Sequence, residues 1–148
     1  MVSAMAHSPA VLSGYLQLSR AMRRTKLSRK ISERISIAVQ VQQGCGGLRL
    51  NSHIDSARLL GIDESEIQRA RAGRSTDPSI AAIIDLALKV YREPTAITDA
   101  QINGLRDHGF SDREIADVVG IVSLNILTGA FNLVAGLTPG RTEPLLDR

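Results

Sequence analysis

The chain of 148 residues contains one cysteine, no tryptophan, two phenylalanines and two tyrosines. A single cysteine cannot form a disulfide within the chain, which favours a reducing compartment, so we expect a cytoplasmic protein. Because aromatic side chains are so few, the core must be built from Ile, Leu, Val and Ala, and an apolar fraction of 43% is enough for one domain of this length. The N-terminus has no basic start followed by an apolar run, so no signal peptide is predicted.

Positive charge is also scarce where DNA binding would need it. The segment 111–127 has the outline of a helix-turn-helix, but no Lys or Arg follows Arg113 until Arg141. A recognition helix presents basic or polar groups to DNA. The formal net charge of +3 is mild, and the sequence predicts no nucleic-acid partner.

The segment from Val118 to Gly140 has no charged residue and is long enough to span a bilayer. Asn125, Thr128 and Asn132 interrupt it at helical spacing, and polar groups are costly in lipid. We therefore predict a helix buried by other helices or by a second subunit, and no membrane partner. A polar stripe of this kind often fixes the register between packed helices, which suggests a homo-oligomer formed through this last helix.

Apolar residues recur at helical spacing along nearly the whole chain, and no segment alternates as a strand would. The predicted fold class is therefore all-α, with a single domain over residues 1–148. The leader 1–8 and the tail 138–148 are expected to be extended. Helices are predicted over 9–24, 28–42, about 50–60, from about 63, from 77 to about 91, over 98–108 and from 111 onward.

Residues 61–67 and 109–115 share a pattern in which a helix-ending glycine precedes a new helix start. The N-cap is Asp63 in the first segment and Ser111 in the second, with a glutamate three positions later in both. This spacing predicts a capping box at each helix start.

Glu33 is a carboxylate within a helix whose following turns are apolar on most sides. If it faces inward, it is partly desolvated and suited to carry a proton. If it faces outward, it pairs with Arg29 or Lys30. The sequence leaves both interpretations open.

Cys45 lies between Gly44 and Gly46, just before a predicted helix. The positive end of the helix dipole lowers the pKa of a thiol at such a position and so favours a reactive thiolate. The alternative is a small hydrophobic residue buried at a tight turn, since free cysteines are among the most buried residues.

His53 follows Leu50 by three residues and precedes Ala57 by four, so it lies on the apolar side of its helix. It is either a satisfied core residue or the proton carrier of a site that it shares with Cys45. His108 is read as structural at a helix end, and His7 lies in the leader. No histidine joins a cluster with metal-ligand spacing, so neither a metal nor a cofactor is predicted.

Taken together, the chain resembles the carboxymuconolactone decarboxylase and alkylhydroperoxidase D-like family from about Pro9 to Pro139. The resemblance rests on LSRKISERISIAVQVQQGC, SHIDSARLLGIDESEI, LRDHGFSDREIADVVGIVSLNI and FNLVAG. It implies an all-helical, generally oligomeric bundle with its active site on a helical hairpin. It also implies that Glu33 matches the proton-relay glutamate, Cys45 the first cysteine and His53 the histidine.

The chain departs from the peroxidase-type pattern, in which Cys-x-x-Cys is followed by a histidine four residues later. Here the run reads CGGLRLNSH, so Leu48 stands where the second cysteine would be, and that cysteine is the one expected to attack the peroxide. In a continuous helix Cys45 and His53 would be about 12 Å apart along the axis, and only a fold-back at Gly46 and Gly47 could bring them together.

Three functions follow from these residues. In the first, Cys45 reduces peroxides as the only thiol, Glu33 and His53 handle protons, and an external thiol reductant resolves the sulfenic acid. In the second, His53 transfers a proton in a decarboxylase or isomerase without the thiol. In the third, the chain is a non-catalytic oligomeric member of the family. Thiol-dependent peroxide reduction by an antioxidant enzyme is the first expectation.

Overall fold

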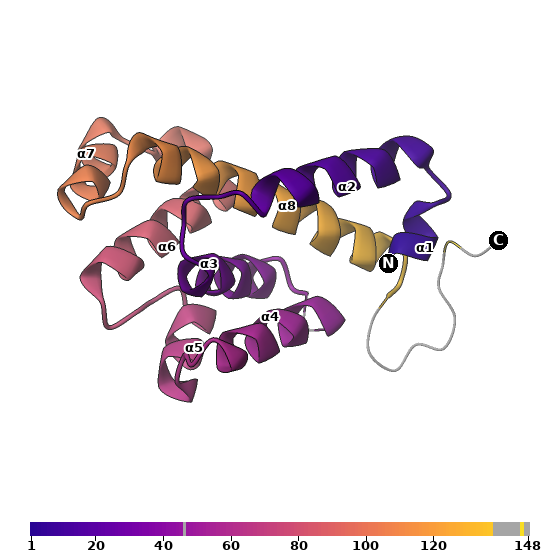
Figure 1. Cartoon of the computed structure of the whole chain (residues 1–148), viewed down its shortest axis with the longest axis horizontal. Coiled ribbons are helices and arrows are strands. Elements are labelled where there is room, and N and C mark those ends of the chain that lie inside the picture. The colour runs from indigo at the N-terminus through magenta and orange to yellow at the C-terminus, as the bar shows by residue number, and fades with distance from the viewer. Residues whose placement is uncertain (46, 138–145, 147–148) are drawn as a thin grey trace.

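The computed structural model describes residues 1–45, 47–137 and 146. These residues form α-helices and one 3₁₀ turn, with no strand among them, so the all-α prediction is confirmed (Figure 1). The elements are α1 (Val2–Met5), α2 (Pro9–Met22), α3 (Arg29–Gln42), α4 (Leu48–Leu59), α5 (Glu64–Arg71), α6 (Pro78–Arg92), η1 (Pro94–Ala96), α7 (Asp99–Asp107) and α8 (Asp112–Val134).

The two ends of the chain were predicted to be extended. For residues 1–8 the structure differs, because Val2–Met5 forms the short helix α1, and Met5 is fully buried. Burial of an unbranched apolar side chain stabilises this turn against the rest of the fold. The predicted tail, 138–148, lies outside the described residues except for residue 146.

Helix starts follow the sequence signals at most positions. Asp77 caps α6 by accepting hydrogen bonds from the backbone N–H groups of Ser79 and Ile80. The predicted capping box of α8 is confirmed, because Ser111 and Glu114 each bond the backbone of the other.

Of the two hydrogen bonds predicted for the capping box at the start of α5, one forms and the other does not. Asp63 accepts a hydrogen bond from Glu66 N, as expected for an N-cap. The Glu66 side chain does not return to the cap. Its carboxylate accepts hydrogen bonds from Ser75 and Thr76 in the loop before α6. Three donors in that loop replace the single backbone donor that a capping box would offer.

Helix α3 is the centre of the fold and lies between the α4–α5 pair and the α6–α8 pair (Figure 1). Ile35 and Val39 belong to an apolar cluster with α6 and α8, whereas Ile37 belongs to a second cluster with α4 and α5. Opposite faces of one helix therefore serve two parts of the core. The aliphatic core predicted from composition is confirmed, since Phe110 is the one aromatic side chain among the buried hydrophobic residues described.

Helix α8 is long and apolar enough to cross a membrane by length and composition alone, with a mean hydropathy of 1.6 over its most apolar window. In this structure it packs against α2, α3 and α6. That packing buries 39% of the apolar window within the chain.

Candidate functional site

The clearest functional geometry joins α3 to α4, which pack closely against one another. Nδ1 of His53 lies 2.7 Å from Oε2 of Glu33, and both side chains are largely buried, at 18% and 13% exposed. Arg29, one turn before Glu33, places Nη2 3.9 Å from the other carboxylate oxygen. Glu33 therefore faces inward, toward α4, while it also approaches the arginine that was its predicted outward partner.

This contact assigns different roles to the two nitrogens of the His53 ring. A carboxylate accepts a hydrogen bond from Nδ1–H, which orients the ring and leaves Nε2 as the atom that can take up or give a proton. Nε2 is buried and has no hydrogen-bond partner among the described residues. A substrate atom that enters this enclosed position would meet an unused proton carrier.

Cys45 lies in the connection between α3 and α4 and is 6% exposed. Its backbone N–H donates to Gln40 O, and its side chain makes no hydrogen bond to Glu33 or His53 in the part of the chain described. Burial raises the pKa of the Cys45 thiol. Desolvation disfavours the charged thiolate, so this direction is opposite to the one expected for a thiol activated by a helix dipole and agrees with the alternative of a buried packing residue.

Because Cys45 is buried, we expect its thiol to react slowly in the native protein. Iodoacetamide should alkylate Cys45 in the native protein more slowly than in the urea-unfolded chain, with the native rate still rising above the pH at which an ordinary thiol is fully ionised. The rate of mass increase at a series of pH values measures this. Rapid native alkylation at neutral pH would contradict it.

The sulfur of Cys45 faces α8 at Gly129. A methyl group at position 129 would lie 3.0 Å from Cys45 Sγ and would overlap the side-chain oxygen of Gln43. Gln43 donates from Nε2 to Ile126 O at 2.9 Å. The missing side chain at Gly129 thus lets the end of α3 and Cys45 approach the α8 backbone.

The polar stripe of α8 is used within the chain. Asn125 donates to Ser36 Oγ at 3.0 Å and to Ile121 O at 2.9 Å, and its Oδ1 accepts from Gln40 Nε2 at 3.0 Å. Thr128 donates to Leu124 O. Asn132 is buried, and its Oδ1 has no partner among the described residues.

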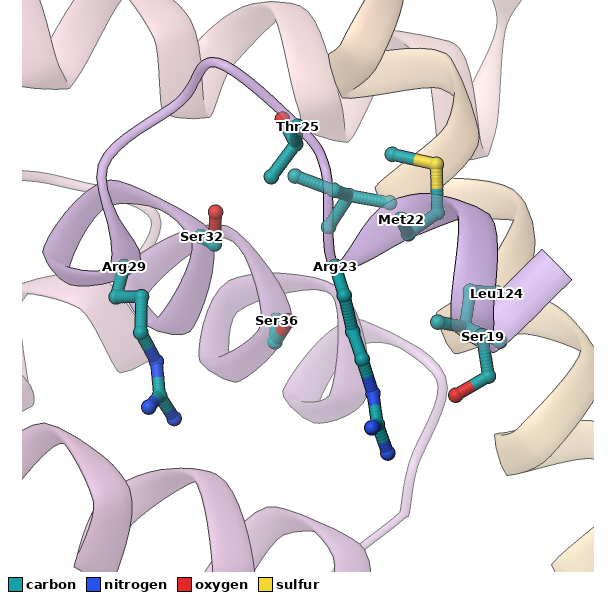
Figure 2. A pocket seen from close by; sticks show the side chains of 9 residues that line it. Ser19, Met22, Arg23, Thr25, Arg29, Ser32, Ser36 and Leu124 are labelled. Atoms are coloured by element: carbon teal, nitrogen blue, oxygen red, sulfur yellow. The ribbon is translucent and has the colours of Figure 1, made fainter.

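A pocket of 590 Å³ opens between α2, α3 and α8. Figure 2 shows Arg23 and Arg29 extending in the same direction, with Ser32 and Ser36 on the stretch of α3 between them in this view. The pocket is lined by Ser19, Met22, Arg23, Thr25, Arg29, Ser32, Ser36, Ile121 and Leu124. Arg29 therefore belongs both to this pocket and to the surroundings of Glu33.

Among the described residues, no three His, Cys, Asp or Glu side chains group closely enough to hold a metal ion. Acid–base chemistry by Glu33 and His53 is what their geometry offers directly. The sequence had paired His53 with Cys45 as well, but the structure brings together only His53 and Glu33.

Comparison with known proteins agrees with this architecture. Residues 9–93 match the carboxymuconolactone decarboxylase family, more than half of the chain, and the protein belongs to that family. None of the curated proteins matches the chain in sequence.

Solved structures show the same fold. An alkylhydroperoxidase AhpD core, an uncharacterised peroxidase-related protein from Ralstonia eutropha, has a TM-score of 0.81 at 21% identity, over 92% of this chain and 74% of that one. A peroxidase-related protein from Silicibacter has a TM-score of 0.73 at 24% identity, over 90% and 69%. A protein of unknown function from Agrobacterium tumefaciens, suggested to be an antioxidant defence protein AhpD, has a TM-score of 0.73 at 20% identity, over 95% of both chains. At these identities the likeness concerns the fold.

Sequence reasoning missed two parts of the site region. The sequence assigned no role to Gln40 of α3 or to Gln43, the C-cap of α3, yet both reach α8. The sequence assigned no binding role to the pocket residues Arg23 and Arg29. A signal was present for Gln40, because an amide between the apolar residues Val39 and Val41 of a helix needs a buried partner when that face packs.

Proposed function

We propose that the protein is an enzyme in which His53 transfers a proton to or from a carbon atom of its substrate, as in a decarboxylase or isomerase. The 2.7 Å contact between His53 Nδ1 and Glu33 Oε2 carries this proposal. The carboxylate orients the ring and stabilises the imidazolium that forms when Nε2 holds a proton. Membership of the carboxymuconolactone decarboxylase family supports the reaction class.

In a decarboxylation, the bond between the carboxylate and its neighbouring carbon breaks, and carbon dioxide leaves. The electron pair stays on that carbon, which takes the proton from Nε2 of His53. The imidazole then regains a proton from water. Glu33 keeps its charge throughout, as its role is to hold Nδ1–H.

A second candidate is peroxide reduction by Cys45, which was the first expectation from the sequence. Cys45 is in the connection between the two helices that carry Glu33 and His53, and the similar folds include peroxidase-related proteins. The thiolate would attack one peroxide oxygen, giving a sulfenic acid and an alcohol. Two equivalents of an external thiol would then restore Cys45 with release of water and a disulfide. We place this reaction second because the Cys45 thiol is buried.

Substitutions at the two positions separate these candidates. Carboxymuconolactone turnover, followed by carbon dioxide release, should fall by about 10²-fold or more in His53→Ala and by about tenfold in Glu33→Gln, while Cys45→Ser retains it. Reduction of cumene hydroperoxide with dithiothreitol is assayed on the same proteins. Loss of peroxide reduction in Cys45→Ser would instead establish the thiol reaction. No turnover of either substrate by the wild type would contradict both and favour a non-catalytic family member.

Assembly and compartment stay predictions. We expect a homo-oligomer in the cytoplasm. The predicted contact residues Asn125, Thr128 and Asn132 are at most 8% exposed within the chain, so a partner would contact the exposed neighbours Val119, Leu133 and Val134. Light scattering measures the subunit number.

A further inference from the structure

The pocket between α2, α3 and α8 presents hydrogen-bond donors with no acceptor. Ser32 Oγ is buried and has no partner among the described residues. Ser36 Oγ accepts from Asn125 Nδ2, so its own hydrogen is left to donate, and no acceptor for it is found in the described part of the chain. Buried donors of this kind are normally satisfied. A ligand that enters the pocket would therefore need acceptor atoms.

The same pocket is lined by two positively charged side chains, Arg23 and Arg29. Arg23 makes no ion pair with any described residue, and Arg29 has a side chain that is 76% exposed and only a 3.9 Å contact with Glu33. The two carboxylates that touch lining residues already have partners. Glu33 bonds His53, and Asp117 accepts from Thr25 Oγ1 and Lys26 N. Both guanidinium groups are thus available to an anion.

Three residues of the lining are apolar. Met22, Ile121 and Leu124 form a wall of the pocket, which Figure 2 shows on the side toward α8 for Met22 and Leu124. A volume of 590 Å³ is in the range of small-molecule sites. The pocket therefore combines donors and cations with a hydrophobic surface.

We propose that this pocket binds a small amphipathic anion. Arg23 and Arg29 hold its carboxylate or phosphate group, and the hydroxyls of Ser32 and Ser36 donate to its oxygens. Its hydrocarbon part packs against the Met22 side of the pocket. This goes beyond the proposed proton transfer, because the pocket residues do not include His53 or Cys45.

Isothermal titration of the full chain tests the site with four probes: octanoate, octyl phosphate, octanamide and inorganic phosphate. Octanoate or octyl phosphate should bind, and the tighter of the two identifies the anionic group. Octanamide, which has the same tail without the charge, should bind at least about tenfold more weakly. Equal binding of octanamide, or displacement of the ligand by inorganic phosphate at similar concentration, would overturn the proposal.

Variants localise the binding. Arg23→Gln and Arg29→Gln should each weaken binding of the preferred anion by about tenfold. Arg24→Gln, an exposed neighbour outside the pocket lining, should not change it. His53→Ala should bind as the wild type does, so failure of the proposed reaction would leave this result intact. Because Arg23 and Arg29 are exposed, circular dichroism should show folded variants, and unchanged affinity in both would refute the site.

Discussion

Replacing Glu66 with glutamine is expected to lower the free energy of unfolding by about 3 kcal/mol at neutral pH. Glu66 is 7% exposed, and its carboxylate accepts hydrogen bonds from Ser75 Oγ at 2.7 Å, Thr76 N at 3.0 Å and Thr76 Oγ1 at 2.6 Å. Arg34 lies 3.9 Å away on α3. An amide keeps the shape but turns one acceptor into a donor, so a loop donor and the Arg34 charge lose their partner. Urea unfolding measures the loss.

The same variant should show a distinct pH dependence. Burial alone would raise the pKa of Glu66, but the hydrogen bonds from Thr76 and Ser75 together outweigh it and lower the pKa. The stabilisation is therefore complete above the pKa of an unfolded glutamate and is lost as the pH falls through the lower folded-state pKa. The difference in stability between wild type and Glu66→Gln should narrow in acid.

Glu64→Gln is the matched control, because Glu64 precedes Glu66 on α5 and is exposed. We expect little change in stability from it at neutral pH. Equal effects of the two substitutions, or a difference from wild type that grows in acid, would contradict the role assigned to Glu66.

Replacing Asn125 with leucine is the second large effect, with an expected loss of about 3 kcal/mol. Asn125 is 3% exposed and connects α8 to Ser36 and Gln40 of α3. Leucine has nearly the same size but leaves the fully buried Gln40 amide without its Oδ1 acceptor. Gln40 Nε2 keeps the backbone oxygen of residue 125, at 3.2 Å, as its remaining acceptor, but Gln40 Oε1 already lacks a partner, so a fully buried amide loses its better acceptor.

A double substitution tests that reasoning. Changing Gln40 to leucine together with Asn125 removes both partners, and replacing both ends of a buried polar contact by apolar groups can be nearly neutral. The double variant should therefore be more stable than Asn125→Leu alone. If the double variant instead loses as much stability as the two single variants added together, the contact is not the source of the effect.

Much of the fold could be predicted from local signals. Helix boundaries were set by residues within a turn of the boundary, as with Asp77 before α6 and the Ser111–Glu114 box. The Asp63 cap was predicted for the same reason. The turning of Glu66 toward Ser75 and Thr76 was not, because those donors reach it only once the α5–α6 loop has folded over α5.

The candidate site shows the same division. Glu33 and His53 were both singled out, but 20 positions separate them, and their contact depends on how α3 and α4 pack. At Cys45 the sequence indicated a helix N-terminus, which lowers the pKa of a thiol, and possible burial, which raises it. It could not show which of the two effects is larger. For Asn125 the sequence suggested a contact with a second subunit, whereas its side chain bonds Ser36 and Gln40 of the same chain.

The central place of α3 determines which parts of the molecule can move. Residues 35–40 of α3 are all buried and pack under four other helices, whereas α2 has no fully buried residue and rests mainly on α8. Segments with few buried contacts open at the lowest free energy. Amide hydrogen exchange should therefore be fast in α2 and slow in α3. The pocket between these helices therefore has one rigid wall, α3, which also carries Glu33, and one wall that opens more easily, α2.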